Sequence, residues 1–164
     1  PLNKNQIYFG TWGRGLIQTH NGEITNVLDR HNSGIQSLNL DNYKPHNIGG
    51  STFDDKNVLW VTCSGAPGAS VNNPLVAFDG SEWHEYSLNN LLVNNTNTGE
   101  IFVDPNGYKW FSSRDNGIFV FDDNGTLSNK DDDRIALITT GENSGNLPTK
   151  AVFEALAIIG LNNL

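Results

Sequence analysis

Apolar and aromatic residues recur along the chain in short runs that alternate with polar turns. Three of these runs align with one another, over residues 6–12, 58–64 and 108–114. Placing Tyr8, Trp60 and Trp110 at equivalent positions gives spacings of 52 and 50 residues. A constant period of this length is typical of folds that repeat one supersecondary unit. The pattern therefore predicts three copies of one structural unit.

Turn signals flank each run. In the third copy, Pro105-Asn106-Gly107 precedes the aromatic residue and is a strong hairpin signal, because Asn and Gly accept the positive φ of tight turns. A second strand follows and ends at Asn21-Gly22, Asp79-Gly80 and Asn124-Gly125 in the three copies. One unit is thus four short antiparallel strands in about fifty residues, which is the signature of a β-propeller blade.

We therefore predict an all-β chain of β-propeller blades, each a four-stranded antiparallel sheet. The stretch with most helical propensity, residues 150–159, falls at the position of the first strand of a further blade. Residues 1–164 are expected to form a partial propeller, with blade units at roughly 1–52, 53–102 and 103–157 and then a truncated remainder. Closed propellers use about four to eight blades, so we expect about three blades of a larger propeller, with the missing blades as partners.

The glycines of Gly10-Thr11-Trp12-Gly13-Arg14-Gly15 raise the alternative of a phosphate-binding loop. Their order is Gly-x-x-Gly-x-Gly, whereas a dinucleotide loop needs Gly-x-Gly-x-x-Gly and must open a helix. Strand-forming residues and an Asn-Gly turn follow instead. We therefore assign the segment to a strand and a sharp turn, in which Gly10 allows close packing and Gly13 and Gly15 allow the turn.

The composition narrows the classes of partner and site. The formal net charge is −8 and acidic residues outnumber basic ones by 18 to 10, which argues against a nucleic-acid partner. No apolar run is long enough to span a membrane. Cys63 is the single cysteine, and its place in an apolar strand predicts a buried, inert thiol. The chain begins with Pro1 and contains no Met, so we expect a mature or excised piece of a longer protein.

Side chains that could bind a metal or catalyse a reaction lack the required spacing. The acidic tract from Asp122 to Asp133 offers oxygen ligands for Ca²⁺, but it matches no helix-loop-helix site, and a solvated turn is favoured. The four histidines are scattered near turns and are expected at the surface: His20, His31, His46 and His84. No Gly-x-Ser-x-Gly motif is present, and most carboxylates fall in turns. We therefore expect no metal, no cofactor and no catalytic residues, and a protein that is not an enzyme.

Recognition of a ligand is the remaining class of function. Trp12, Arg14, Arg114 and Asp115 fall at the end of the strand-and-turn unit, where propeller loops are exposed at one face. A Trp face stacks on sugar rings, and Arg pairs bidentately with phosphate or carboxylate. These four residues form the predicted ligand-binding set. The competing interpretation packs Trp12 between blades and leaves the arginines solvated.

The same segments resemble the two-component-regulator type of propeller repeat. The likeness is carried by residues 8–25 (YFGTWGRGLIQTHNGEIT), by residues 101–127, and by Asn146-Leu147-Pro148, which leads into the next first strand. The second copy departs from the pattern at residues 62–68, where a longer loop replaces the Gly-Thr core. The blades are therefore not expected to present the same ligand contacts.

Within that family, the string from Asp122 to Pro148 is similar to the surface propellers of the Bacteroidetes type IX secretion system. This resemblance implies an extracytoplasmic binding or scaffold protein, in the periplasm or at the outer-membrane surface. It also implies a sortase-like surface protein and lipopolysaccharide, or another glycan, as partners. The alternative is a periplasmic ligand-sensing propeller of a hybrid two-component histidine kinase. A carbohydrate-active or lyase-type propeller is the third class.

Overall fold

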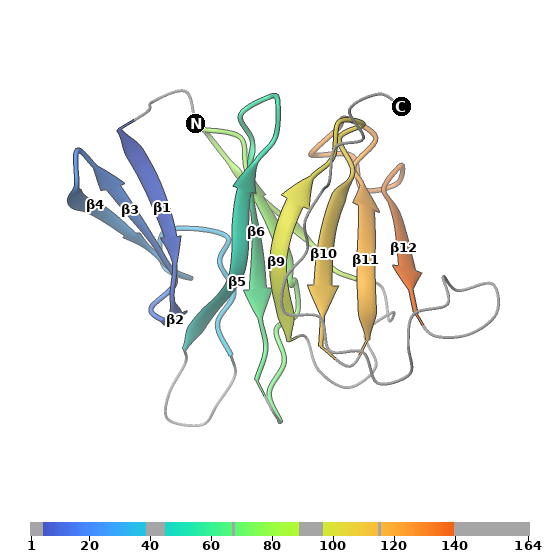
Figure 1. Ribbon diagram of the computed structural model, residues 1–164, viewed down its shortest axis with the longest axis horizontal. Helices are drawn as coiled ribbons and strands as arrows, with labels where there is room; N and C mark the ends of the chain where they lie inside the picture. Colours follow the sequence, from blue (N-terminus) through green and yellow to red (C-terminus); the bar gives the residue numbers. More distant parts are fainter. Residues whose placement is uncertain (1–4, 39–44, 67, 89–96, 115, 140–164) are drawn as a thin grey trace, which may run out of the picture.

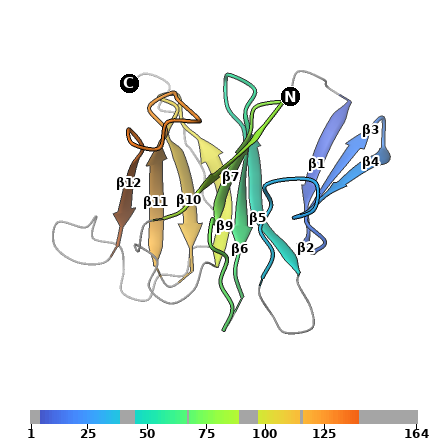
Figure 2. The ribbon, with the colours of Figure 1, turned by 180° about the vertical axis from the view of Figure 1, so that it is seen from behind.

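Three antiparallel sheets make up the described part of the chain. The computed structural model describes residues 5–38, 45–66, 68–88, 97–114 and 116–139. Those residues form twelve strands and no helix. The sheets stand side by side in a row, as both views show (Figure 1 and Figure 2). The architecture is all-β, as predicted, and is consistent with blades of a β-propeller.

Strands that follow one another along the chain are neighbours within each sheet, with one exception. The first sheet has the order β1-β3-β4, the second β2-β5-β6-β7-β8 and the third β12-β11-β10-β9. The exception is β2, which pairs with β5 of the second sheet. The bounds are β1 (Gln6–Gly10), β2 (Trp12–Gly13), β3 (Leu16–His20), β4 (Glu23–Leu28), β5 (His46–Phe53), β6 (Leu59–Ser64), β7 (Leu75–Phe78), β8 (Trp83–Tyr86), β9 (Thr98–Val103), β10 (Lys109–Ser113), β11 (Gly117–Asp122) and β12 (Arg134–Ile138).

The hairpins are closed by the turn residues that the sequence pattern indicates. Asn21 and Gly22 join β3 to β4 with φ values of 53° and 85°. Gly80 and Gly107 adopt φ values of 100° and 87° between β7 and β8 and between β9 and β10. Positive φ at these positions favours Asn and Gly over other residues. The predicted Asn-Gly and Asp-Gly turns are confirmed.

The aligned aromatic residues occupy the same place in each sheet. Tyr8, Trp60 and Trp110 lie on β1, β6 and β10. Trp60 Nε1 donates to Asp54 Oδ2, and Trp110 Nε1 donates to Asp104 Oδ2, both at 3.0 Å. The other oxygen of each carboxylate accepts two backbone N–H groups of its own hairpin turn. In the second and third sheets, the repeat in the sequence is therefore a repeat of the same local structure.

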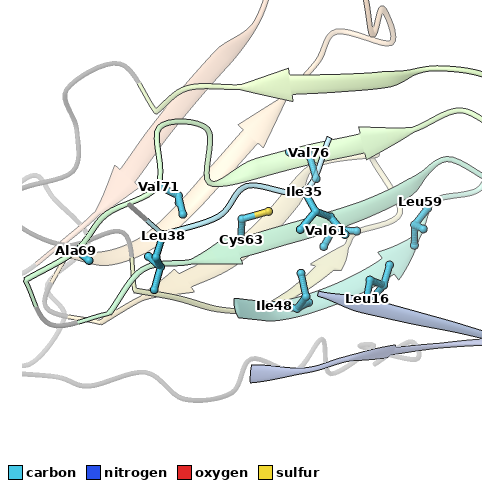
Figure 3. Close-up of a cluster of buried hydrophobic side chains, with 10 residues drawn as sticks. All are labelled: Leu16, Ile35, Leu38, Ile48, Leu59, Val61, Cys63, Ala69, Val71 and Val76. Atoms are coloured by element: carbon cyan, nitrogen blue, oxygen red, sulfur yellow. The ribbon is translucent and has the colours of Figure 1, made fainter. Parts of the chain in front are cut away.

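Two apolar clusters hold the three sheets together. Between the first and second sheets, Leu16 of β3 packs with Leu59 and Val61 of β6, and with Ile35 and Leu38 of the connection from β4 to β5 (Figure 3). Between the second and third sheets the cluster is largely aromatic and includes Trp60, Tyr86, Phe111, Phe119 and Phe121. Burying a side chain of this size contributes roughly 1.5–3 kcal/mol, so packing between sheets is a main source of stability.

Cys63 lies fully buried in the first of these clusters (Figure 3). Its sulfur accepts a hydrogen bond from Gln36 N at 3.4 Å, and burial raises the pKa of the thiol to about 12. The reactive form of cysteine is the thiolate, which this pKa makes scarce at neutral pH. The prediction that this thiol is buried is confirmed.

The glycine-rich segment after β1 is a strand and a turn. A Cβ at Gly10 would lie 2.7 Å from Cγ2 of Ile48, so close packing there requires glycine. Gly13 and Gly15 have φ values of 115° and 84° and lead the chain into β3. Because a strand follows where a phosphate loop would open a helix, the nucleotide-loop alternative is wrong.

The predicted unit boundaries do not coincide with the sheets. The boundary between residues 52 and 53 falls inside β5, and the one between 102 and 103 falls inside β9. Apart from β2, the second sheet runs from His46 to Tyr86 and the third from Thr98 to Ile138. The strand expected at residues 150–159 lies outside the described residues.

Candidate functional site

The segments between strands gather at two opposite edges of the three sheets. Strands β1, β6 and β10 run in one direction, so residues 11–15, 65–66, 68–74, 114 and 116, which follow them, lie at the same edge, the lower one in Figure 1. The connection from β4 to β5 starts and ends there as well. We call this the loop edge. The turns that close the hairpins lie at the opposite edge, which we call the hairpin edge.

Trp12 and Arg14 lie in a well-anchored turn at the loop edge. Thr11 Oγ1 donates to Gly15 O at 2.7 Å and accepts a hydrogen bond from Arg14 N at 3.2 Å. Trp12 and Gly13 pair with β5, so the turn of the first sheet is held against the second. The Trp12 side chain is nevertheless 65% exposed, and Arg14 is exposed too. Trp12 is therefore not buried between the first and second sheets.

Arg114 lies at the same edge but on the third sheet. It is exposed, and its backbone N–H donates to Asn97 O at 2.9 Å. The second sheet stands between it and the turn that holds Trp12 and Arg14 (Figure 1). Asp115, the fourth predicted ligand-binding residue, lies outside the described residues. The fold thus brings Trp12, Arg14 and Arg114 to one edge, but not into one pocket.

Charged side chains divide unequally between the two edges. Three of the four arginines in the described residues lie at the loop edge, namely Arg14, Arg30 and Arg114. An anionic ligand would therefore meet less repulsion there than elsewhere on a chain whose net charge is −8. Eleven of the fourteen described acidic residues lie in or beside turns of the hairpin edge: Glu23, Asp54, Asp55, Asp79, Glu82, Asp104, Asp122, Asp123, Asp131, Asp132 and Asp133.

His46 supports the turn that carries Trp12, and it is buried, which corrects the surface position expected from the sequence. Its carbonyl oxygen accepts a hydrogen bond from Gly15 N at 2.9 Å, and its backbone pairs with Gly13. Burial lowers the pKa of the imidazole, whose Nε2 has no hydrogen-bond partner. The burial follows from the pairing of β2 with β5, which joins residues far apart in the sequence and has no local signal.

Asp123 is a second correction, because it is buried and does not belong to a solvated turn. Its Oδ1 accepts a hydrogen bond from Lys109 Nζ at 2.5 Å, and both side chains are buried. The Lys109 ammonium lies 4.3 Å from the centre of the Trp60 ring, so the pair lies where the third sheet packs against the second. In the same tract, Thr126 donates to the Asp132 carboxylate at 3.0 Å in an exposed turn.

The described residues contain no group of three or more His, Cys, Asp or Glu side chains arranged to hold a metal ion. Among the same residues, no helix is long and apolar enough to cross a membrane. Sequence reasoning did not single out Arg30 and Glu85, which line a polar cavity near the loop edge. The available signal was the longer loop after β6, where the second copy departs from the repeat.

Comparison with known proteins gives one informative similarity. No family model matches the sequence, and no curated protein matches it. Among solved structures, the chain is similar to PorZ, an essential bacterial surface component of the type-IX secretion system of Porphyromonas gingivalis. The sequence identity is 25% and the TM-score is 0.66, over 81% of this chain and 18% of PorZ. The chain therefore has a PorZ-like fold and spans about a fifth of the length of PorZ.

Proposed function

We propose that this PorZ-like chain is part of a non-enzymatic β-propeller that acts outside the cytoplasm as a cell-surface binding component of type IX secretion. The observation that carries the proposal is the similarity to PorZ, a surface component of that system, over 81% of the chain. The two-component-regulator type of repeat, suggested by the sequence motifs, belongs to the same proposal. The partners would be a sortase-like surface protein, an anionic glycan such as lipopolysaccharide, or both.

The proposed binding surface is the loop edge around Trp12 and Arg14. An indole that is 65% exposed at the end of an anchored turn presents a flat apolar face, on which a sugar ring can stack. The guanidinium of Arg14, two residues later in the same turn, would pair with a phosphate or carboxylate group of the glycan. Because the turn is hydrogen-bonded to β5, little conformational entropy is lost when a ligand binds. Arg114 would contact a ligand long enough to reach the third sheet.

A ligand-sensing propeller of a hybrid histidine kinase is the second candidate, favoured by the repeat motif in residues 8–25 and 101–127. The two candidates differ in the rest of the gene. A transmembrane span and a kinase domain downstream would support the sensor, and a C-terminal immunoglobulin-like sorting domain would support the secretion component. The full-length gene therefore decides between them.

The binding surface is tested by a pull-down with lipopolysaccharide that compares the wild-type chain with Trp12→Ala and Arg14→Ala. Each substitution is expected to weaken binding about tenfold, because stacking and a charge-assisted hydrogen bond each contribute about 1–2 kcal/mol. The matched controls are Tyr108→Ala and Arg134→Ala, an exposed aromatic and an exposed arginine at the hairpin edge. Equal binding by all five proteins would overturn the assignment of Trp12 and Arg14.

A further inference from the structure

A polar cavity of about 320 Å³ lies beside the second sheet, close to the loop edge. Its walls come from three segments that are distant in the sequence. Arg30 and Gln36 belong to the connection from β4 to β5, Ser70 and Asn72 belong to the loop after β6, and Glu85 lies on β8. The volume is at the small end of the range of ligand sites, roughly 300–1,000 Å³.

The loop that closes this cavity exists only in the second repeat. Ten residues, 65–74, join β6 to β7, whereas three residues, 114–116, join β10 to β11. Within the longer loop, Ala69 and Val71 are buried in the core while Ser70 and Asn72 are exposed. This alternation anchors the loop through its apolar residues and leaves the polar residues between them for the cavity. Insertions into one copy of a repeat often build a binding face.

The exposed Glu85 carboxylate is held in place at the rim of this cavity. Its Oε2 accepts hydrogen bonds from Gln36 Nε2 at 3.0 Å and from Asn73 Nδ2 at 2.7 Å. Gln36 Nε2 also donates to Gly34 O at 3.0 Å, which fixes the amide. No described residue donates to Oε1. One carboxylate oxygen is therefore oriented and has capacity to accept a hydrogen bond from a ligand.

Arg30 supplies the donors of the cavity. It lines the same space as Glu85, yet no guanidinium nitrogen lies within 4.0 Å of the Glu85 carboxylate, so the two form no ion pair. The Ser70 hydroxyl and the Asn72 amide add groups that both donate and accept. Ile35 also lines this space, but its side chain is buried in the core cluster, so the cavity presents mainly polar groups. The cavity thus combines one fixed acceptor, one exposed cationic donor and neutral polar groups.

We infer that this cavity binds a single uncharged sugar residue. A phosphate or other strong anion would be repelled by Glu85, and a metal ion by Arg30, because each charge would lie within the same small space. A sugar hydroxyl donates to a carboxylate and accepts from a guanidinium, so one ring satisfies both groups at once. This inference goes beyond the proposed function, because it uses neither Trp12 nor Arg14 and names an uncharged ligand.

The test is titration of the chain with neutral monosaccharides (glucose, galactose, mannose and N-acetylglucosamine), followed by chemical-shift changes in NMR spectra. At least one is expected to bind with a Kd of about 1 mM, which corresponds to about −4 kcal/mol. Glu85→Gln should weaken binding at least about tenfold, because it removes a charged acceptor. Ser70→Trp, which fills the cavity from its exposed rim, should abolish it.

Two control variants test whether the loss of binding is specific to this cavity. Glu82→Gln removes an exposed carboxylate at the hairpin edge and should bind as the wild type does. Trp12→Ala should also bind normally, so a failure of the proposed lipopolysaccharide surface would leave this result intact. A thermal unfolding curve shows whether the Ser70→Trp variant is folded. If it is not, the titration of Glu85→Gln decides whether the sugar binds in this cavity. The inference is overturned if no monosaccharide binds, if Glu85→Gln binds like the wild type, or if inorganic phosphate or glycine displaces the sugar.

Discussion

At the scale of single residues, an aspartate makes the same set of hydrogen bonds in two of the sheets. Asp54 and Asp104 each use one oxygen to accept backbone N–H groups of a hairpin turn and the other to accept the indole N–H of Trp60 or Trp110. Each Asp therefore ties its turn to the aromatic residue of the next strand. The sequence shows this device as an Asp six residues before a Trp, in two of the three copies.

Asp133 is a residue whose surroundings disfavour its charge. Burial raises its pKa to about 6, the Lys130 ammonium opposes that rise, and the carboxylates of Asp132 and Asp123 add to it. Its Oδ1 is buried without a hydrogen-bond partner. The pKa in the folded state therefore exceeds the value in the unfolded chain, which is about 3.9. Asp133 consequently stabilises the fold most at low pH, and this contribution is lost as the pH rises through about 6.

Asp133→Asn is expected to raise the free energy of unfolding at about pH 7.5 by on the order of 1 kcal/mol, because it removes a charge that is unfavourable in the folded state. The gain should shrink toward pH 5, where the folded wild type binds the proton. Urea denaturation of both proteins at the two pH values measures it, with the exposed Asp131→Asn as control. Burial lowers the pKa of His46, so His46 makes stability rise with pH. This contribution is the same in both proteins and cancels when their free energies of unfolding are compared. A gain that is larger at pH 5 would contradict the prediction.

At the scale of elements, the second and third sheets approach most closely through two glycines. Strands β5 and β9 are in direct contact where these glycines lie. A Cβ at Gly49 would lie 2.2 Å from Thr98 O, and a Cβ at Gly50 would lie 2.7 Å from Glu100 Cα. Since those neighbours are backbone atoms, they cannot move without moving β9. Glycine is required here by the distance between strands.

Gly50→Ala is therefore expected to destabilise the chain by about 3 kcal/mol, at the upper end of the usual cost of overpacking. Gly80→Ala is the matched control, because nothing lies within 4 Å of its Cβ position and only its φ of 100° is unfavourable. That strain costs roughly 1–2 kcal/mol. Chemical denaturation of both variants measures the difference. Equal losses would show that β9 yields to the added methyl group.

At the scale of the whole molecule, one face of the first sheet is apolar and exposed. Ile7 and Phe9 of β1 are 50% and 51% exposed, and Ile24 and Val27 of β4 are exposed as well. Leu59 and Val61 occupy the positions in the second sheet that are equivalent to Ile7 and Phe9, and there the first sheet buries them. The exposed face is thus the kind of surface that a neighbouring sheet covers elsewhere in this fold. Large exposed apolar patches promote association.

The chain alone is therefore expected to self-associate as its concentration rises. Sedimentation velocity over a concentration series measures this, and the double variant Ile7→Thr/Phe9→Thr should shift the population toward monomer. The control is Tyr108→Thr, which removes an exposed aromatic residue at the hairpin edge. A wild-type chain that stays monomeric and melts cooperatively would contradict the expectation.

Features that depend on residues close together in the sequence could be predicted, whereas features that depend on residues distant in the sequence could not. The turn at Asn21-Gly22 was predictable because it depends on the φ values of its own residues. Cys63 was predictable because it lies in an apolar strand. The positions of His46 and Asp123 were not, because both are buried by segments of the chain that are distant in sequence. The candidate site was predictable only in part: Trp12 and Arg14 follow from the repeat, whereas Arg30 and Glu85 do not.

The sequence was enough to define the strands and the all-β class, from the spacing of Tyr8, Trp60 and Trp110 and the turns around them. Local backbone preferences and period-two alternation depend only on residues that are neighbours in the sequence. Which side chains meet was settled by packing alone. The pairing of β2 with β5 leaves Trp12 exposed and His46 buried, and the long loop after β6 folds back to place Ser70 near Glu85. Contacts of this kind depend on the three-dimensional arrangement of whole sheets, for which a single sequence carries no local signal.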